Sequence, residues 1–246
     1  LYLARRLQSG DRTAAIMSRI ESLWRTGRRL PGACNPVFAA WKQAGHMTAD
    51  VVWERIGLAM EARELTLARE LAVHLPPADR VWVERWQAMH RDPVRGLESI
   101  DYPIETPVAR MIVKHGIVRL AYRDPEAAMQ QWERLRRRHA FYGEDNDYVL
   151  RYIGILAAQY RLPQALEWLS AVSARPDDRA LKLWRIYAAL WAQEWDAARR
   201  FIAALSEEEQ RTTRWRYWTA RLLEQEGRKD EARAIYAALA RERDYY

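Results

Sequence analysis

The side chains that most often perform catalysis or bind metal ions are scattered in this sequence. The histidines stand far apart, with no pair at positions i and i+4 and no cysteine cluster beside them, so their spacing does not favour a zinc site. They are His46, His74, His90, His115 and His139. The sequence also lacks a glycine-rich phosphate loop, a G-x-S-x-G turn around a nucleophilic serine and a dinucleotide-binding fingerprint. We therefore expect no catalytic, cofactor-binding or metal-binding residue in this chain.

Charge is the first feature that points to a partner. Lys plus Arg number 40 against 33 Asp plus Glu, which gives a net charge of +7. This balance suits an anionic partner such as nucleic acid, acidic lipid or an acidic polymer. The one dense basic run is Arg136, Arg137 and Arg138 with His139. Such a run is more often a solvated face or a helix C-terminus than a binding site, and we keep its three arginines as candidate contacts for a ligand or a neighbouring domain.

Aromatic residues are abundant, with 12 Trp and 12 Tyr. Aromatic faces pack well against sugar rings, but most of these residues fall on apolar stripes of helical period and are predicted to be core residues. They include Trp168, Trp184 and Trp191. The run that contains Trp215, Tyr217 and Trp218 differs, because consecutive aromatic residues cannot all face one core. We expect this run to pack between helical hairpins and keep its aromatics as candidate contacts for sugar or a neighbouring domain.

An internal repeat organises the chain. Five segments carry an Ala followed seven residues later by Leu or Val, namely Ala68/Leu75, Ala128/Leu135, Ala165/Val172, Ala198/Leu205 and Ala232/Leu239. From Ala128 onward the copies follow at intervals of 37, 33 and 34 residues, which is the length of two helices and their turns. Seven residues make two helical turns, so the small Ala and the later Leu share one stripe along which another helix can approach closely. One helix pair cannot cover such a stripe, so neighbouring pairs must stack.

A second stripe with a period near 3.6 precedes the repeat copies, and strand-like alternation is absent. It runs through Val149, Ile153, Leu156 and Tyr160 in one case and through Leu181, Trp184, Ala188 and Trp191 in the next. We predict an all-α, right-handed superhelical solenoid of antiparallel helix hairpins, similar to tetratricopeptide repeats. Gly and Pro do not cluster into a linker, so we expect a single domain over residues 1–246 with about seven helix pairs. The pair near 79–107 is expected to be irregular, with helices over 79–90 and 93–100 and a loop over 101–107.

Local signals mark where helices begin. Asn35, Asp92 and Asp124 each precede a proline and are predicted to be N-caps, because proline is well tolerated in a first helical turn. Ser206 with Glu209 three residues later is typical of a capping box. No run of about 18 apolar residues is present, so we expect no membrane span.

Two stretches resemble a known family. The first is Trp215-Arg216-Tyr217-Trp218-Thr219-Ala220-Arg221, continued by Gly227-Arg228, Glu231-Ala232, Leu239-Ala240 and Tyr245-Tyr246. The second is Trp24-Arg25-Thr26-Gly27, followed by Pro31, Ala33-Cys34, Phe38 and Trp41, then Glu54-Arg55-Ile56 and Leu58-Ala59-Met60. In spacing, residue type and order, both resemble the superhelical domain of soluble lytic murein transglycosylases.

The resemblance implies a function. In that family the superhelical region forms a ring-like platform, joined through a linker domain to a lysozyme-like domain. The latter cleaves the bond between N-acetylmuramic acid and N-acetylglucosamine and leaves a 1,6-anhydro product, with one catalytic Glu of raised pKa. The resemblance therefore implies a non-catalytic scaffold of a periplasmic peptidoglycan enzyme, one that supports the catalytic domain and guides glycan strands. Its partners would be its own linker and catalytic domains and, through the parent enzyme, peptidoglycan.

The catalytic motif of the family is not matched here. In the family, a Glu-Ser pair precedes a Gly-Leu-Met-Gln run, whereas Glu21-Ser22 and Glu98-Ser99 lack that run and are predicted to be surface residues. The stretch Gly57-Leu58-Ala59-Met60 is interpreted as part of a repeat helix. We accordingly expect the chain to be a fragment of a longer protein, ending before the linker and without its signal peptide.

Cys34 is the single cysteine. Its local sequence predicts a small buried residue. Family members also carry a cysteine upstream of the position where Leu1 aligns, so the resemblance implies that Cys34 is half of a disulfide whose partner is absent from this chain.

Two other functions fit parts of the pattern. A tetratricopeptide-like adaptor for a protein segment fits the repeat length, although its W-x-x-L-G-x-x-Y pattern is not met. An RNA-binding helical repeat is suggested only by charge, without recurrent base-reading side chains. We expect a monomer that does not bind nucleic acid.

Overall fold

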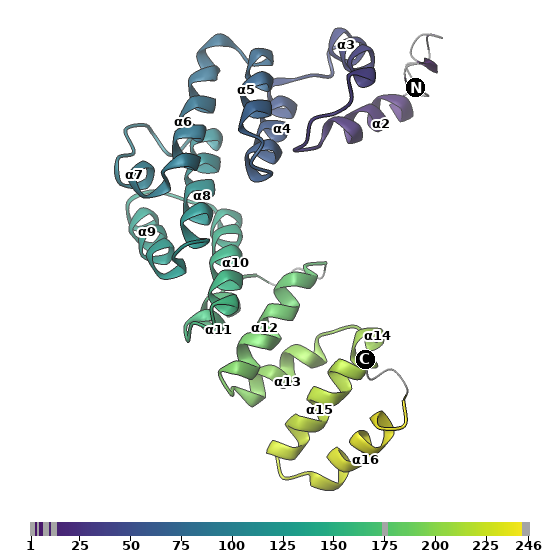
Figure 1. Ribbon diagram of the computed structural model, residues 1–246. Coiled ribbons are helices and arrows are strands. Elements are labelled where there is room, and N and C mark those ends of the chain that lie inside the picture. The colour runs from purple at the N-terminus through teal and green to yellow at the C-terminus, as the bar shows by residue number, and fades with distance from the viewer. Residues whose placement is uncertain (1–2, 4, 7–9, 11–13, 174–176, 243–246) are drawn as a thin grey trace. The chain divides into compact units, whose positions relative to one another are not determined.

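The computed structural model describes residues 3, 5–6, 10, 14–173 and 177–242, in which helices and their connecting turns occur without a strand (Figure 1). The all-α prediction is therefore confirmed. The helices are α2 (Ala14–Trp24), α3 (Asn35–Gln43), α4 (Ala49–Glu61), α5 (Leu65–Leu71), α6 (Arg80–Arg91), α7 (Pro93–Glu98), α8 (Pro107–Ala121), α9 (Pro125–Arg138), α10 (Gly143–Gln159), α11 (Ala165–Ser170), α12 (Arg179–Trp191), α13 (Trp195–Ala203), α14 (Glu207–Gln210), α15 (Thr213–Gln225) and α16 (Lys229–Leu239). Short 3-10 turns, η1 (Gly32–Cys34), η2 (Ala72–His74) and η3 (Pro77–Asp79), join some of them. In the part described, no helix is long and apolar enough to cross a membrane.

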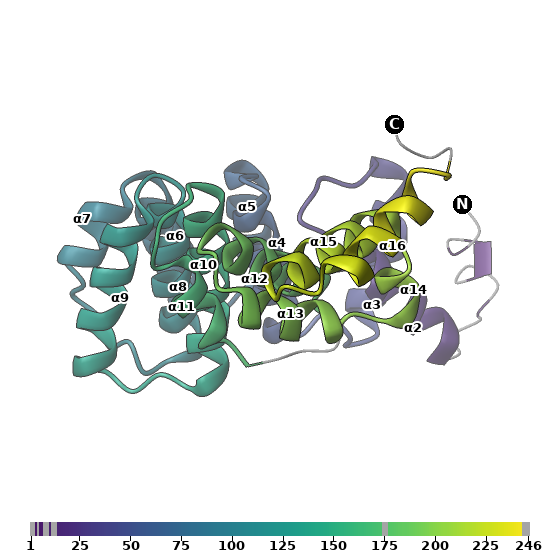
Figure 2. The same cartoon turned by 90° about the horizontal axis from the view of Figure 1, so that it is seen from below.

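Internal contacts divide the chain into two compact units. Unit 1 comprises residues 1–120 and 135–141, and unit 2 comprises residues 121–134 and 142–246. Within unit 1, α2 packs on α3, α4 on α5 and α6 on α7; within unit 2, α10 packs on α11, α12 on α13 and α15 on α16 (Figures 1 and 2). Contacts also join consecutive pairs, such as α5 with α6 and α11 with α12. A single domain over the whole chain remains a prediction.

The repeated Ala/Leu seam is buried in every copy. All five alanines and the five Leu or Val partners belong to the core; they are Ala68, Leu75, Ala128, Leu135, Ala165, Val172, Ala198, Leu205, Ala232 and Leu239. Because the alanine methyl is small, another helix can approach the seam closely, and the later Leu or Val fills the space two turns on. The sequence spacing therefore located these core positions correctly.

A repeated turn joins the two helices of several pairs. The first helix ends in a left-handed residue at Arg63, Arg161, Gln193 or Gly227, with φ between 57° and 80°. The N–H of the next residue donates to a carbonyl five residues earlier, as Glu194 does to Ala189 at 2.9 Å, while the N–H of Gln193 donates to Leu190 O at 3.2 Å. These two bonds form a Schellman motif, which satisfies the last carbonyls of the helix and reverses the chain. The same local device therefore sets the hairpin in successive pairs.

Three of the four predicted helix starts are confirmed. Asp92 accepts from Arg95 N at 3.1 Å and Asp124 from Ala127 N at 2.9 Å. Ser206 and Glu209 form the reciprocal capping box. Asn35 is not an N-cap, because η1 runs directly into α3 and gives Asn35 helical dihedrals (φ −57°, ψ −44°) in place of the extended backbone of a cap.

The irregular pair has nearly the predicted boundaries. After η3, α6 covers Arg80–Arg91, α7 covers only Pro93–Glu98, and residues 99–106 form no helix. The short α7 approaches α6 closely at Gly96, where a methyl group would lie 2.7 Å from Met89 Sδ.

Candidate functional site

The predicted basic run lies at the end of a helix. Arg136, Arg137 and Arg138 form the last turn of α9 and are exposed. Positive side chains there interact favourably with the negative end of the helix dipole, which gives the run a structural role without a ligand. Whether it also contacts glycan or another domain remains a prediction.

The aromatic run in α15 divides between core and surface. Trp215 is buried in the core of unit 2, and Trp218 packs against the same core cluster. Tyr217 is 38% exposed, and its ring lies edge-on to Trp218 and tilted against Tyr236, with centroids 5.6 Å and 6.0 Å away. Packing in the core of unit 2 therefore accounts for Trp215 and Trp218, whereas Tyr217 remains partly exposed. The continuation of this landmark at Tyr245-Tyr246 lies outside the described residues.

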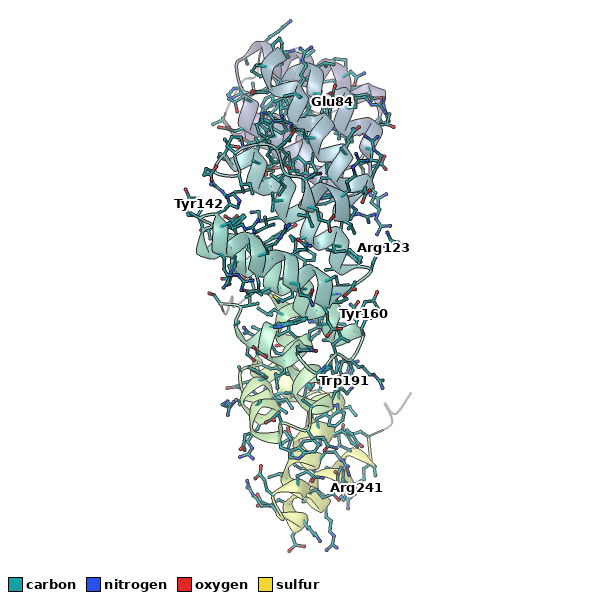
Figure 3. All side chains as sticks on the ribbon, turned by 90° about the vertical axis from the view of Figure 1, so that its left-hand side faces the viewer. Glu84, Arg123, Tyr142, Tyr160, Trp191 and Arg241 are labelled. Carbon is teal, nitrogen blue, oxygen red and sulfur yellow. The ribbon has the colours of Figure 1, made fainter. Side chains whose placement is uncertain are left out.

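A row of exposed aromatic rings lies along one edge of unit 2. The prediction that Trp191 is a core residue is wrong, because it is 43% exposed, and Tyr160, at the end of the other stripe, is 53% exposed. Trp191 is the last residue of α12 and Tyr160 follows the last residue of α10, so the helical period carries both rings past the buried part of their stripes. Figure 3 shows Arg123, Tyr160 and Trp191 following one another along this edge. Tyr160 Oη donates to Tyr122 O at 2.9 Å, and the Arg161 guanidinium lies 5.3 Å from the Trp191 ring centre.

The other two tryptophans predicted to be core residues are only partly buried. Trp168 and Trp184 are both half-buried. Trp184 lies against Trp191 with ring centroids 6.2 Å apart, so it contributes to the base of the aromatic edge.

Unit 1 contains a hollow of about 370 Å³ between α2, α3, α4 and α5. Its aromatic wall is Trp24, the last residue of α2, whose indole N–H donates to Val51 O at 3.3 Å, and Phe38 of α3, edge-on to Trp24 at 5.1 Å. The remaining lining includes Leu30, Met47, Leu67 and Leu71. The hydrogen bond and the edge-on ring contact fix the orientation of the Trp24 indole, so the aromatic wall is preformed.

Arg55 of α4 lines this hollow and is only 4% exposed. Its guanidinium carbon lies 4.1 Å from the centre of the Trp24 ring and 5.8 Å from that of Phe38. The Nε atom is buried without a hydrogen-bond partner among the residues that the structure describes. Burial lowers the pKa of Arg55, and Cys34 acts in the opposite direction. A stacked arginine thus has donors left for a ligand.

The rim of the hollow carries further charged groups. Lys42 Nζ lies 3.3 Å from His74 Nδ1, and the pKa of His74 is lowered by burial, by Lys42 and by Arg55. The neutral imidazole can therefore accept a hydrogen bond from the Lys42 ammonium group. Across the rim Arg29 pairs with Glu70 at 2.7 Å.

Cys34 is half-buried beside this site, at the end of η1, and forms no disulfide with any described residue. Its pairing with an upstream cysteine remains a prediction. The Glu-Ser pairs lie at the surface: Glu98 and Ser99 are exposed, and Glu21 pairs with Arg25 at 2.6 Å. No group of three His, Cys, Asp or Glu residues suited to a metal ion occurs in the described part of the chain.

Sequence reasoning missed the hollow, although one signal was available. Arg55 lies on the same face of α4 as the buried residues Val52, Ile56 and Ala59. A charged residue on an otherwise apolar helical face is unusual, and its position beside Trp24 follows only from the packing of α2 on this region.

The fold and this geometry define an all-α protein of stacked helix pairs with the repeat length of helical solenoids. No protein-family model matches the chain. The soluble lytic murein transglycosylase of Salmonella typhimurium is 27% identical over 241 residues, which are 97% of this chain and 37% of that protein. The Escherichia coli K12 enzyme of the same name is 26% identical over 228 residues, 92% of this chain and 35% of the relative.

Solved structures agree with the sequence relatives. An inactive variant of the lytic transglycosylase Slt of Pseudomonas aeruginosa superposes with a TM-score of 0.86 at 29% identity, covering 100% of this chain and 40% of that one. The 70-kDa soluble lytic transglycosylase of Escherichia coli gives a TM-score of 0.69 at 22% identity, which shows the shared fold. The chain is thus homologous to part of the soluble lytic murein transglycosylases and spans 35% to 37% of the length of these curated relatives. The adaptor alternative is not favoured by these comparisons.

Proposed function

We propose that the chain is the non-catalytic superhelical scaffold of a periplasmic lytic transglycosylase. The parent protein would cleave peptidoglycan between N-acetylmuramic acid and N-acetylglucosamine with formation of a 1,6-anhydro end. The observation that carries this proposal is the match over the whole chain, at a TM-score of 0.86, to 40% of a lytic transglycosylase. The scaffold would hold the linker and catalytic domains, and the parent would act as a monomer.

The scaffold would also guide the glycan. The exposed rings of Tyr122, Tyr160 and Trp191 offer flat apolar faces, and Arg123 and Arg161 lie next to two of them in the chain. Sugar rings pack on aromatic faces, and the carboxylates of peptidoglycan suit nearby cations. The net charge of +7 points in the same direction.

The test compares the natural full-length protein with a form that lacks residues 1–246. Whole sacculi and short soluble glycan strands are supplied as separate substrates. We expect the deletion to slow release from sacculi far more than cleavage of short strands, because a guiding surface matters only for the large substrate. Equal effects on both substrates, or none on sacculi, would contradict the guiding role; a full-length protein that cleaves neither would contradict the parent activity.

A matched pair of substitutions tests the aromatic edge without deletion. Trp191→Ala removes an exposed ring, whereas Trp86→Phe changes a ring that is buried in unit 1 and does not line the hollow. We expect weaker co-sedimentation of the 246-residue chain with sacculi for the first variant only. Unchanged sedimentation of Trp191→Ala would exclude this edge as a glycan contact.

A further inference from the structure

The hollow in unit 1 carries an uncompensated positive charge. Burial and Cys34 shift the pKa of Arg55, and burial, Lys42 and Arg55 shift that of His74; among the residues that the structure describes, no carboxylate is a cause of either shift. Glu70 is the single carboxylate among the described lining residues, and Arg29 holds it at 2.7 Å. The described lining therefore offers Lys42 and Arg55 no paired carboxylate.

A guanidinium buried in this way is expensive unless its donors are matched. Stacking on Trp24 at 4.1 Å stabilises the face of the Arg55 guanidinium but leaves its edge N–H groups unpaired. Its buried Nε has no hydrogen-bond partner, and no hydrogen bond or ion pair joins the guanidinium to any described residue. A carboxylate has the geometry to accept two parallel N–H bonds from such an edge, and Lys42 adds a second cation at the rim.

The other walls indicate what that carboxylate is attached to. Phe38, Leu67 and Leu71 are buried apolar residues that face the hollow, and Leu30 and Met47 extend this surface. A volume of about 370 Å³ is at the lower end of small-molecule sites. An inorganic anion would leave the apolar wall uncovered, whereas a small molecule with a hydrocarbon body would cover it.

We propose that this hollow binds a small organic carboxylate. The carboxylate contacts Arg55 and Lys42, and the apolar body lies against Phe38, Leu67 and Leu71. If the proposed function holds, peptidoglycan offers this chemistry in the lactyl group of N-acetylmuramic acid and in the free carboxyl end of its peptides. Only this choice of source rests on the proposed function; the binding of a carboxylate follows from the hollow itself.

The test is a titration of the 246-residue chain, followed by the chemical shift of the Trp24 indole N–H, which Trp24→Phe assigns. The probes are N-acetylmuramic acid and acetyl-alanyl-alanine, with N-acetylglucosamine and the amidated dipeptide as matched compounds without a carboxylate. We expect a saturable shift with at least one carboxylate and none with its neutral counterpart. Binding of the sugar or of the peptide then identifies the source. The absence of a shift with both carboxylates would overturn the proposal. So would equal shifts with the neutral compounds, or tighter binding of inorganic phosphate than of either carboxylate.

Three substitutions separate binding from folding. Arg55→Met keeps an unbranched chain against Trp24 and should raise the dissociation constant of the carboxylate by about tenfold or more. Lys42 is exposed, so Lys42→Met should leave the chain folded and weaken carboxylate binding severalfold. Arg185→Met is the control, because Arg185 is a partly buried arginine of unit 2 whose Nε donates to Leu169 O at 2.9 Å, and binding should not change. Unaltered affinity in both Arg55→Met and Lys42→Met would refute the assignment, whereas the parent's cleavage activity would stand untouched by that result.

Discussion

Replacing Gly27 by alanine should disrupt a close backbone approach in unit 1. A methyl group on Gly27 would lie 2.2 Å from Leu58 O and 2.6 Å from Leu58 C, which are backbone atoms of α4 and cannot rotate away. Overpacking of this kind costs about 3 kcal/mol when the obstruction is rigid. Alanine also lowers the conformational entropy of the unfolded chain, which stabilises the folded state by about 0.5–1 kcal/mol. The net expectation is a loss of about 2 kcal/mol, with α2 displaced from α4 and Trp24 from Arg55.

The assay is urea unfolding combined with hydrogen exchange of the amides in α2 and α4. We expect faster exchange in both helices and a midpoint shift that corresponds to about 2 kcal/mol. Gly32→Ala is the matched control, because the nearest atom to its added methyl is Asn35 Nδ2 at 4.0 Å. The free energy of unfolding of that variant should stay within about 0.5 kcal/mol of the original value. A Gly27→Ala protein as stable as the control would refute the close approach on which the Trp24 wall depends.

Three further predictions address single interactions. Gln193→Gly should stabilise the chain by up to about 1 kcal/mol in thermal unfolding, because Gln193 is held at φ 57° in the Schellman turn; a loss of stability would show that the side chain matters more than the backbone. Asp178→Ala should cost about 2–3 kcal/mol, since Asp178 pairs with Arg151 at 2.5 Å and caps α12 through Leu181 N at 3.0 Å. Asp178→Asn, which keeps a capping oxygen, should cost about 1 kcal/mol less, and equal losses would exclude the cap. Burial lowers the pKa of His115 to about 3, with contributions from His90 and Arg119, so its neutral form stabilises the fold above pH 6.5 and that stability is lost as the pH falls toward 3. Below pH 6.5 the free energy of unfolding of His115→Phe should therefore fall less steeply than that of the original protein, and the two slopes should differ by about 1.4 kcal/mol per pH unit. Parallel pH curves for the two proteins would contradict the lowered pKa.

The helical architecture could be predicted because its causes are local or periodic. The Ala/Leu seam, Asp92, Asp124 and the Ser206 capping box act over a few residues, and each lies where the spacing placed it. The prediction that Asn35 is an N-cap failed because a preceding 3-10 turn gives this residue a helical backbone, and no simple cap signal reveals that turn.

The functional surfaces depended on information that periodicity does not contain. Tyr160 and Trp191 continue stripes that begin with buried residues, yet both rings are exposed where their helices end. The hollow around Arg55 needs side chains from α2, α3, α4 and α5 at once, with sequence separations of up to about fifty residues. Such a site is visible only after the helices are packed.

The most direct test of the proposed function is the chemistry of the product. The natural full-length protein is incubated with purified sacculi, and the released muropeptides are identified by mass spectrometry. We predict N-acetylmuramic acid ends in the 1,6-anhydro form, lighter by one water molecule than the products of hydrolysis. Release of only hydrated reducing ends, or of no muropeptide at all, would contradict the account.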